Sequence, residues 1–385
     1  MTLPSINRDI DIVCFSLSRW DAPISSPAVS LAKELSKNNR VFYIEHPYSF
    51  KDFIKEGKSA RQYTDSNVRV VTPPLVYPIN FLPEGKLYNA LSSANNSILL
   101  KTLRKVLHQS HVRQYVFINF FDPFFLRAIP PDVKPARFIY QCMDDISQVA
   151  YTAKHGIRLE NEIVKNADVV LCTSRELLRL KSVFSANVHF HPNAADVDLF
   201  KRAATEVLNR PADMDFGDKK VIGFMGSIEY RTDFELLVKL AKHHHDKILF
   251  MVGPVSGNEH ITSGLNWLPN VVFAGAKRLE ELPAYLQYFD CCIIPYKVNT
   301  LTASIYPLKI NEYLAAGKPV VATNFSEDIL SFKEVAYIVS SHAEFIDTID
   351  KAIEENVINR KVARMEAAST NSWEKRVEQF WDIIT

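Results

Sequence analysis

The sequence lacks a hydrophobic run long enough to cross a membrane, and its first residues do not have the pattern expected of a secretory leader. No stretch approaches the roughly 20 apolar residues that a bilayer-spanning helix needs. No basic region precedes the first apolar run in the opening residues MTLPSINRDIDIVCFSL. We therefore expect a cytoplasmic protein, with at most a peripheral association with the inner face of the cell membrane.

Cysteine is scarce, and its spacing excludes two kinds of site. The chain has five cysteines with no C-x-x-C pair, and most of them lie in apolar, strand-like runs. This pattern is typical of buried cytosolic thiols, not of a disulfide framework or a zinc site. The run His243–His245 lies at a predicted helix end, where imidazolium favours the helix dipole. We expect neither a metal ion nor a cofactor. The cysteines are Cys14, Cys142, Cys172, Cys291 and Cys292.

Low-complexity tracts, short repeats and nucleic-acid-binding motifs are also lacking. Hydrophobic residues make up 47% and charged residues 23% of the chain, which indicates a globular protein. A length of 385 residues exceeds one ordinary core and predicts two domains of roughly 150 to 200 residues each. Without a basic domain or a recognised motif, we expect no nucleic-acid partner.

The net charge of +1 conceals a basic first half. Residues 1–200 hold 24 Lys and Arg against 19 Asp and Glu (+5), whereas residues 201–385 hold 21 against 25 (−4). Ten basic and four acidic side chains lie between Lys51 and Arg113. This stretch is either a solvated helical face or a contact for an anionic membrane or a lipid-phosphate acceptor. The aromatic residues interleaved with these charges are Phe53, Tyr63, Tyr77, Phe81 and Tyr88.

Short β-branched or aromatic runs alternate with amphipathic stretches, which predicts an α/β fold of parallel strands joined by helices. The polar segment 201–219 interrupts this pattern, which restarts with KKVIGFMGSI. We expect an amino-terminal domain at 1–200 that includes the terminal helix 373–385, a linker at 201–219 and a second domain at 220–372. The two similar halves predict two doubly wound sheets that face one central cleft.

The predicted strands of the first half lie near Asp11–Leu17, Arg40–Ile44, Val68–Val71, Tyr115–Asn119, Arg137–Gln141, Val169–Thr173 and Val188–His191. Those of the second half lie near Val221–Met225, Ile248–Val252, Val271–Ala274, Cys291–Pro295, Pro319–Ala322 and Ala336–Ile338.

The segment SIYPLKINEYLAAGKPVVAT is the most informative part of the chain. Its proline and glycine predict a helix that begins near Tyr306 and ends before a strand. A helix start offers unpaired N–H groups that suit phosphate oxygens. Lys309 in the first turn and Glu312 on the same face could meet a diphosphate and a ribose diol. The alternative is a surface ion pair between these two side chains.

A second segment, VIGFMGSIEYRTDFELL, has the pattern of a strand, a glycine, a short loop and a helix. Gly226 permits close backbone approach, and the amides of Ser227 and Ile228 could form an anion-binding nest. Arg231 could add a bidentate phosphate contact. A plain strand-to-helix turn would have the same pattern.

Together these segments resemble the retaining, family-four glycosyltransferases of the GT-B fold, in particular the bacterial branch that makes capsule, exopolysaccharide and teichuronic acid. The resemblance rests on PLKINEYLAAGKPVV, GFMGSIEYRTDFELL, FMVGP, NVVFAGAKRLEELPAYLQYFDCCIIPY and PNAADVDLF. SWEKRV resembles the final helix of the family, which crosses back to the first domain. In the amino-terminal half the resemblance rests on the order of elements, on SSPAVSLAKELSKNNRVFYI and on YQCMDDIS.

The resemblance implies a role for particular residues. Glu312 matches the second glutamate of the E-x7-E motif and would bind the donor ribose. Arg231 and Lys309 would stabilise the leaving diphosphate, while Asp144 or Asp145 would orient or deprotonate the acceptor hydroxyl. The complete set implied for the donor is Gly226, Ser227, Arg231, Lys277, Ser304, Tyr306, Leu308, Lys309 and Glu312.

Two departures from the family pattern stand out. Ser304 replaces the first glutamate of E-x7-E, so no carboxylate there can act as a nucleophile or hold the sugar. The Gly-Gly pair after the first strand is replaced by SLSRWDAPISSP. Candidate acceptor contacts in that loop, chosen by position, are Ser16, Ser18, Arg19 and Trp20.

The expected function is the transfer of a sugar from a nucleotide-sugar donor, a UDP-sugar or a GDP-sugar, to a glycan or lipid-linked saccharide. The resemblance implies retention of configuration, and Ser304 then favours a front-face displacement. Two alternatives remain open. One is a GT-B nucleotide-sugar epimerase, and the other is a non-catalytic partner subunit of a polysaccharide-assembly complex.

Overall fold

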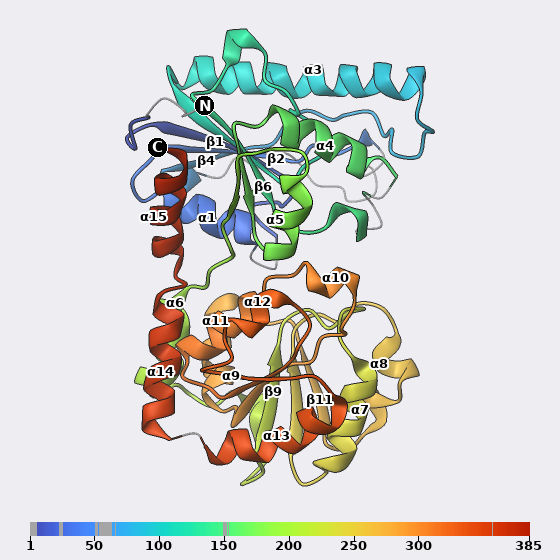
Figure 1. The fold of residues 1–385 in the computed structure, drawn as a ribbon, viewed down its shortest axis with the longest axis vertical. Coiled ribbons are helices and arrows are strands. Elements are labelled where there is room, and N and C mark those ends of the chain that lie inside the picture. Colours follow the sequence, from blue (N-terminus) through green and yellow to red (C-terminus); the bar gives the residue numbers. More distant parts are fainter. Residues whose placement is uncertain are drawn as a thin grey trace. The chain divides into compact units, whose positions relative to one another are not determined.

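The computed structural model describes residues 6–22, 26–50, 53, 64–65, 67–148, 152, 154–355 and 357–385. The chain forms two compact units, each built around its own sheet (Figure 1). The amino-terminal unit comprises Met1–Pro192 and Arg376–Thr385, and the carboxyl-terminal unit comprises Asn193–Lys375. The division lies ahead of the linker predicted at 201–219, because helix α6 (Val197–Thr205) packs against α9 (Leu282–Gln287) of the second unit.

The amino-terminal sheet has eight strands among the described residues, in the order β3-β4-β2-β1-β5-β6-β7-β8. Every pairing is parallel except that of β3 with β4. Strands β2, β5, β6 and β7 are buried along their whole length, as expected for a parallel sheet covered on both faces. The strands are β1 Asp11–Ser16, β2 Val41–Glu45, β3 Thr64–Asp65, β4 Val68–Val71, β5 Tyr115–Phe120, β6 Arg137–Cys142, β7 Val169–Cys172 and β8 Val188–Phe190.

Helices cover this sheet, and the last helix of the chain belongs to it. The long α3 runs along this unit (Figure 1). Its side chains Leu99, Leu103 and Val106 are buried in the core. Helix α15 is held to β8, since Gln379 Nε2 donates to the Phe190 carbonyl at 3.0 Å. The helices are α1 Pro27–Leu35, α3 Lys86–Gln109, α4 Gly156–Asn166, α5 Arg175–Ser182 and α15 Trp373–Ile384, with 3-10 turns η1 Pro131–Val133 and η2 Ile146–Gln148.

The carboxyl-terminal sheet has six parallel strands in its described residues, in the order β11-β10-β9-β12-β13-β14. The chain winds outward from β9 in both directions, so the strand order reverses beside β9, where α/β folds bind ligands. The strands are β9 Val221–Met225, β10 Ile248–Val252, β11 Val271–Gly275, β12 Cys291–Ile294, β13 Val320–Thr323 and β14 Tyr337–Val339.

The remaining elements of this unit are helices and short turns around the sheet. They are α7 Phe234–His243, α8 Glu259–Thr262, α10 Thr300–Ala303, α11 Leu308–Ala315, α12 Glu327–Leu330, α13 His342–Glu354 and α14 Ile358–Ser369, with η3 Ala212–Met214, η4 Leu265–Trp267 and η5 Leu279–Glu281.

The predicted α/β architecture of two doubly wound sheets is confirmed. The helix predicted from Tyr306 begins instead at Leu308, because Pro307 has ψ +72° and stands outside the helix as its cap. All five cysteines are buried with free thiols. Among the described helices, none combines the length and apolar character required to span a bilayer.

Candidate functional site

Gly226 and Lys309 meet at the carboxyl edge of the second sheet. Gly226 follows β9 directly and has φ +137°, a conformation that favours glycine. A Cβ atom there would lie 1.8 Å from Lys309 Cε and 2.6 Å from Nζ, so the lysine side chain lies over the glycine. Gly253 is equally close-packed, since its Cβ would lie 2.0 Å from the Gly226 carbonyl oxygen. Any side chain at Gly226 would therefore displace Lys309.

Tyr296 holds the ammonium group of Lys309. This tyrosine follows β12, and its hydroxyl accepts a hydrogen bond from Lys309 Nζ at 3.0 Å. The ammonium also lies 5.7 Å from the Tyr296 ring centroid and 5.8 Å from that of Phe224, within the range of cation–π attraction. Within the described residues Lys309 forms no salt bridge with Glu312, so the predicted alternative of a surface ion pair is not what the structure has.

Arg231 brings a second positive charge to the same tyrosine. It lies in the loop between β9 and α7, where it pairs with Glu229. Its guanidinium carbon lies 6.0 Å from the Tyr296 ring centroid. Ser227, in the same loop, is half-buried. The amide of Ile228 donates to the Pro254 carbonyl at 2.9 Å. Because this hydrogen bond occupies the amide, the prediction that Ile228 contributes to an anion-binding nest is wrong.

Glu312 is half-buried, and its carboxylate lies in a poorly solvated position with little compensation. Desolvation raises the pKa of Glu312 to about 7, although the nearby Lys309 charge acts in the opposite direction. Among the described residues the carboxylate has no hydrogen-bond partner. A desolvated acid with a perturbed pKa beside a cation at a sheet edge is typical of a functional site. Hydroxyl donors from a ligand would favour its ionised form.

The segment before α11 differs from the expected phosphate-binding helix start. Pro307 has φ −79° and ψ +72°, an inverse γ-turn in which the Leu308 N–H donates to the Tyr306 carbonyl at 2.9 Å. The Leu308 amide, expected to face the diphosphate, is therefore occupied. The Tyr306 side chain is buried. Ser304 is also buried, and its hydroxyl donates to the Leu301 carbonyl at 2.7 Å, which leaves it no proton to give a sugar.

Lys277 lies beyond β11 and is neutralised by an acidic partner. Its Nζ is 2.8 Å from Asp213 Oδ2, and the Tyr285 hydroxyl donates to the same carboxylate. The interactions of Lys277 with Asp213 first and with Tyr285 next raise the pKa of Lys277. The arrangement fixes the loop after β11. If Lys277 contacts a nucleotide base, it does so while it is paired with Asp213.

In the amino-terminal unit, the two predicted catalytic aspartates differ in their surroundings. Both follow β6. Asp145 is buried, and its Oδ1 accepts from the Ser147 amide at 3.0 Å and from the Ser147 hydroxyl at 2.7 Å. It therefore caps the short turn η2. Asp144 is half-buried, and its carbonyl oxygen lies 3.7 Å from Cys142 Sγ.

The loop after β1 is pinned by Glu45. Arg19 lies 3.4 Å from Glu45 Oε2, and the Trp20 amide donates to Oε1 at 3.0 Å. The Ser18 carbonyl accepts from the Tyr43 hydroxyl at 2.9 Å. Ser16 is fully buried and accepts from the Ser18 amide, so the prediction of Ser16 as an acceptor contact is wrong. Its hydroxyl shapes the turn instead.

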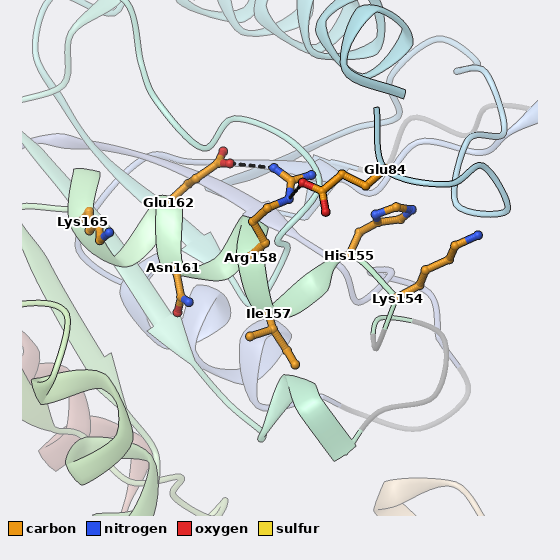
Figure 2. Close-up of a pocket in the computed structure, with 8 residues that line it drawn as sticks. All are labelled: Glu84, Lys154, His155, Ile157, Arg158, Asn161, Glu162 and Lys165. Atoms are coloured by element: carbon orange, nitrogen blue, oxygen red, sulfur yellow. Dashed lines mark hydrogen bonds and ion pairs between the residues drawn. The ribbon is translucent and has the colours of Figure 1, made fainter. Parts of the chain in front are cut away.

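A hollow of about 480 Å³ lies along α4, apart from every predicted site residue (Figure 2). Arg158 forms ion pairs with Glu84 at 2.9 Å and with Glu162 at 3.0 Å. Figure 2 shows the guanidinium held between these two carboxylates. We assign this hollow no role.

Sequence patterns missed Tyr296, which connects Lys309 and Arg231. The available signal was a polar aromatic residue directly after the strand run CCII, since residues beyond the carboxyl ends of parallel strands line ligand sites. Gly253 belongs to the quoted segment FMVGP, yet its contact with Gly226 requires the folded geometry.

Comparison with known proteins identifies a family match within the second unit. Residues 219–355 match the model of the family described as glycosyl transferases group 1. The chain is 30% identical over 223 residues to TuaH of Bacillus subtilis (strain 168), a protein named as a teichuronic acid biosynthesis glycosyltransferase. That match covers 56% of this chain and 56% of the relative, so just over half of each is compared.

Solved structures of the same fold cover almost the whole chain. A sucrose-phosphate synthase of Thermosynechococcus elongatus aligns over 97% of this chain and 98% of its own, with a TM-score of 0.68 and 16% identity. Anabaena Alr3699/HepE, solved in complex with UDP, aligns over 97% and 99%, with a TM-score of 0.64 and 14% identity. At these identities the likeness establishes the GT-B fold.

Proposed function

From the glycosyl transferases group 1 domain at residues 219–355 and the GT-B fold, we propose that this chain is a glycosyltransferase of bacterial surface-polysaccharide biosynthesis. It transfers a sugar from a nucleotide-sugar donor to a saccharide or lipid-linked acceptor. A UDP-sugar is the favoured donor, supported by the UDP and the UDP-2-fluoro glucose bound in two structures of the same fold. The donor binds the carboxyl-terminal unit and the acceptor binds the amino-terminal unit.

The observation that carries the proposal is the pair of cations around Tyr296 at the carboxyl edge of β9. Lys309 lies over Gly226, and Arg231 lies within 6.0 Å of the same aromatic ring. As the bond between the sugar and the diphosphate breaks, negative charge grows on the leaving oxygen, and fixed cations stabilise that charge. These two side chains supply the positive charge, so the proposed reaction needs no cofactor and no metal ion.

Glu312 binds the ribose in this proposal. Its carboxylate has no hydrogen-bond partner in the described part of the chain, so ribose hydroxyls can donate hydrogen bonds to it. Ser304 offers no carboxylate and its hydroxyl is bonded to Leu301, which is consistent with a front-face displacement that retains configuration. Asp144 or Asp145 orients the acceptor hydroxyl.

The basic and aromatic segment of the amino-terminal unit supports a peripheral contact with an anionic membrane on the cytoplasmic side. Phe81 is 71% exposed, Leu87 is 62% exposed and Lys86 between them is exposed. Exposed apolar side chains beside cations suit a lipid surface. Tyr88 is buried in the core, and Tyr63 lies outside the described residues.

The test is the transfer of label from radiolabelled UDP-sugars and GDP-sugars in the presence of bacterial membrane lipids, with wild type and Lys309→Met compared. The proposal predicts transfer of label to the lipid or glycan fraction and a loss of at least about a hundredfold in the variant, the magnitude usual for one group that stabilises a transition state. A second sugar nucleotide formed without acceptor would instead identify an epimerase. Absence of any product with all nucleotide sugars would favour a non-catalytic subunit.

A further inference from the structure

The amino-terminal unit contains a cavity of about 280 Å³ that the site described so far does not include. This volume is just below the usual range of about 300–1,000 Å³ for small-molecule sites, so it suits a small group and not an extended chain. Its walls come from α3 and from the segments after β2, β4 and β5. Lining residues include His46, Ser49, Tyr77, Asn80, Phe124 and Phe125.

A histidine with a buried carboxylate partner lies in the wall of this cavity. His46 Nδ1 lies 2.5 Å from Asp122 Oδ2, and Asp122 is fully buried. The other carboxylate oxygen accepts from the Phe124 amide at 2.8 Å and from the Phe125 amide at 3.2 Å. These bonds fix the carboxylate, and the carboxylate in turn fixes the imidazole ring.

The pairing leaves one ring nitrogen of His46 available. A carboxylate accepts hydrogen bonds, so Nδ1 carries a proton, and in the neutral imidazole Nε2 then keeps its lone pair. Among the described residues Nε2 has no hydrogen-bond partner, and the His46 side chain is 29% exposed. His46 lines the cavity and Asp122 does not, and because Nδ1 is bonded to Asp122, Nε2 is the ring nitrogen left for a bound molecule.

The pair lies where this fold binds ligands. His46 follows β2 and Asp122 follows β5, the two strands that flank β1, and the strand order reverses there. Phe121 and Leu126, on either side of the Asp122 turn, have φ +57° and +50°. Non-glycine residues with strained backbone conformations of this kind cluster at functional sites, which favours a functional role for this turn.

The other walls combine aromatic faces with small polar groups. Tyr77 is 49% exposed, and its ring lies 6.0 Å from that of Phe50. The Phe125 ring lies 5.4 Å from the His46 ring. Ser49 and Asn80 add polar atoms. A pyranose matches such walls, because its C–H face is apolar and its edge carries hydroxyls.

We propose that this cavity binds the terminal sugar of the acceptor, with His46 Nε2 accepting a hydrogen bond from one of its hydroxyls. Asp122 is a positioning residue that holds the imidazole in the accepting tautomer. The assignment rests on the proposed function, since it gives that reaction its acceptor subsite, and it names a sugar ring as the occupant.

Saturation-transfer NMR of the full chain with four methyl glycosides tests this assignment. The probes are methyl glycosides of glucose, galactose, N-acetylglucosamine and glucuronic acid. We expect at least one to receive saturation, and we expect its signal to fall at least about threefold in His46→Gln and in Tyr77→Ala. His245→Gln and Trp267→Ala, exposed residues of the carboxyl-terminal unit, are the matched controls and leave the signal unchanged.

The variant Asp122→Asn tests whether Asp122 acts by positioning His46 or only by stabilising the fold. The amide would donate to His46 Nδ1 and move the proton to Nε2, so ring ¹⁵N shifts should report the other tautomer, with glycoside binding lost at an unchanged Tm. Saturation that is absent for every glycoside, or that persists in His46→Gln, would overturn the assignment. With octyl glucoside, saturation of the alkyl protons alone would mean that a lipid tail occupies the cavity. UDP binding, measured on the same samples, reports separately on the proposed function.

Discussion

Lys309 depends for its position on the absence of a side chain at Gly226. Gly226→Ala would place a methyl group 1.8 Å from Lys309 Cε, in a backbone conformation that alanine rarely adopts. We expect a stability loss of about 1–3 kcal/mol from the backbone strain. We also expect at least about a tenfold rise in the Kd for UDP, measured by calorimetry, because the ammonium is displaced.

Gly264→Ala is the matched control for this change. Gly264 has φ +85°, so alanine is strained there too, but no atom lies within 4 Å of the added methyl group. The control should lose stability while it keeps its affinity for UDP. Equal affinity losses in the two variants would show that the Lys309 contact is irrelevant to nucleotide binding.

The raised pKa of Glu312 predicts that nucleotide-sugar binding depends on pH. Its pKa of about 7 means that the carboxylate is largely protonated below neutral pH in the free protein. Ribose hydroxyls favour the ionised form, so the affinity for UDP-glucose should rise between about pH 6 and about pH 8, with a proton released on binding. UDP-glucose is the right probe, because its diphosphate diester does not titrate in this range. A Glu312→Gln variant should show a flat profile, and parallel profiles for the two proteins would contradict the assignment.

The raised pKa of Glu312 also makes the stability of the fold depend on pH. The folded state keeps the Glu312 proton up to about pH 7, whereas the unfolded chain loses it near the ordinary value of 4.5. Stability from this group is therefore present below the unfolded pKa and is lost as the pH rises through the folded pKa. Glu312→Gln should accordingly raise the Tm at about pH 8 and change it little at about pH 4.

Helices α4 and α5 are joined by a buried ion pair. Lys181 Nζ lies 2.6 Å from Glu160 Oε2, with side chains that are 7% and 1% exposed. Lys181→Met would leave the Glu160 carboxylate buried without its cation, at a cost of about 3–5 kcal/mol in urea unfolding. The exposed pair of Lys239 with Glu235 is the control, since Lys239→Met should change stability by less than about 1 kcal/mol. A small effect at Lys181 would show that water reaches the pair.

The elements themselves were largely predictable from the sequence, whereas contacts between them were not. β-branched runs such as VVLC and CCII predicted the parallel strands, because strands buried on both faces need continuous apolar side chains. The two-residue β3 carries too little pattern to detect. Tyr296 and the pair of His46 with Asp122 depend on residues far apart in the chain, and the occupied Leu308 amide depends on the ψ angle of Pro307.

At the scale of the whole molecule, the chain has two units with separate cores. A ligand that binds one native unit stabilises that unit by mass action, and the effect grows with ligand concentration. Differential scanning calorimetry should therefore resolve two transitions, of which saturating UDP raises only one. The shifted transition should also be the one that Gly226→Ala lowers. A UDP shift confined to the transition that Lys181→Met lowers would place the nucleotide in the amino-terminal unit.

The central claim is that the proposed donor site of Gly226, Arg231, Lys309 and Glu312 binds a nucleoside diphosphate. The most direct test is calorimetric titration of UDP, GDP, ADP, CMP and dTDP into the wild type and into Glu312→Ala. We predict that UDP binds selectively and that the variant loses at least about tenfold in affinity while its Tm is not lowered. Unchanged UDP affinity in the variant, or no binding of any nucleotide to the wild type, would contradict the claim.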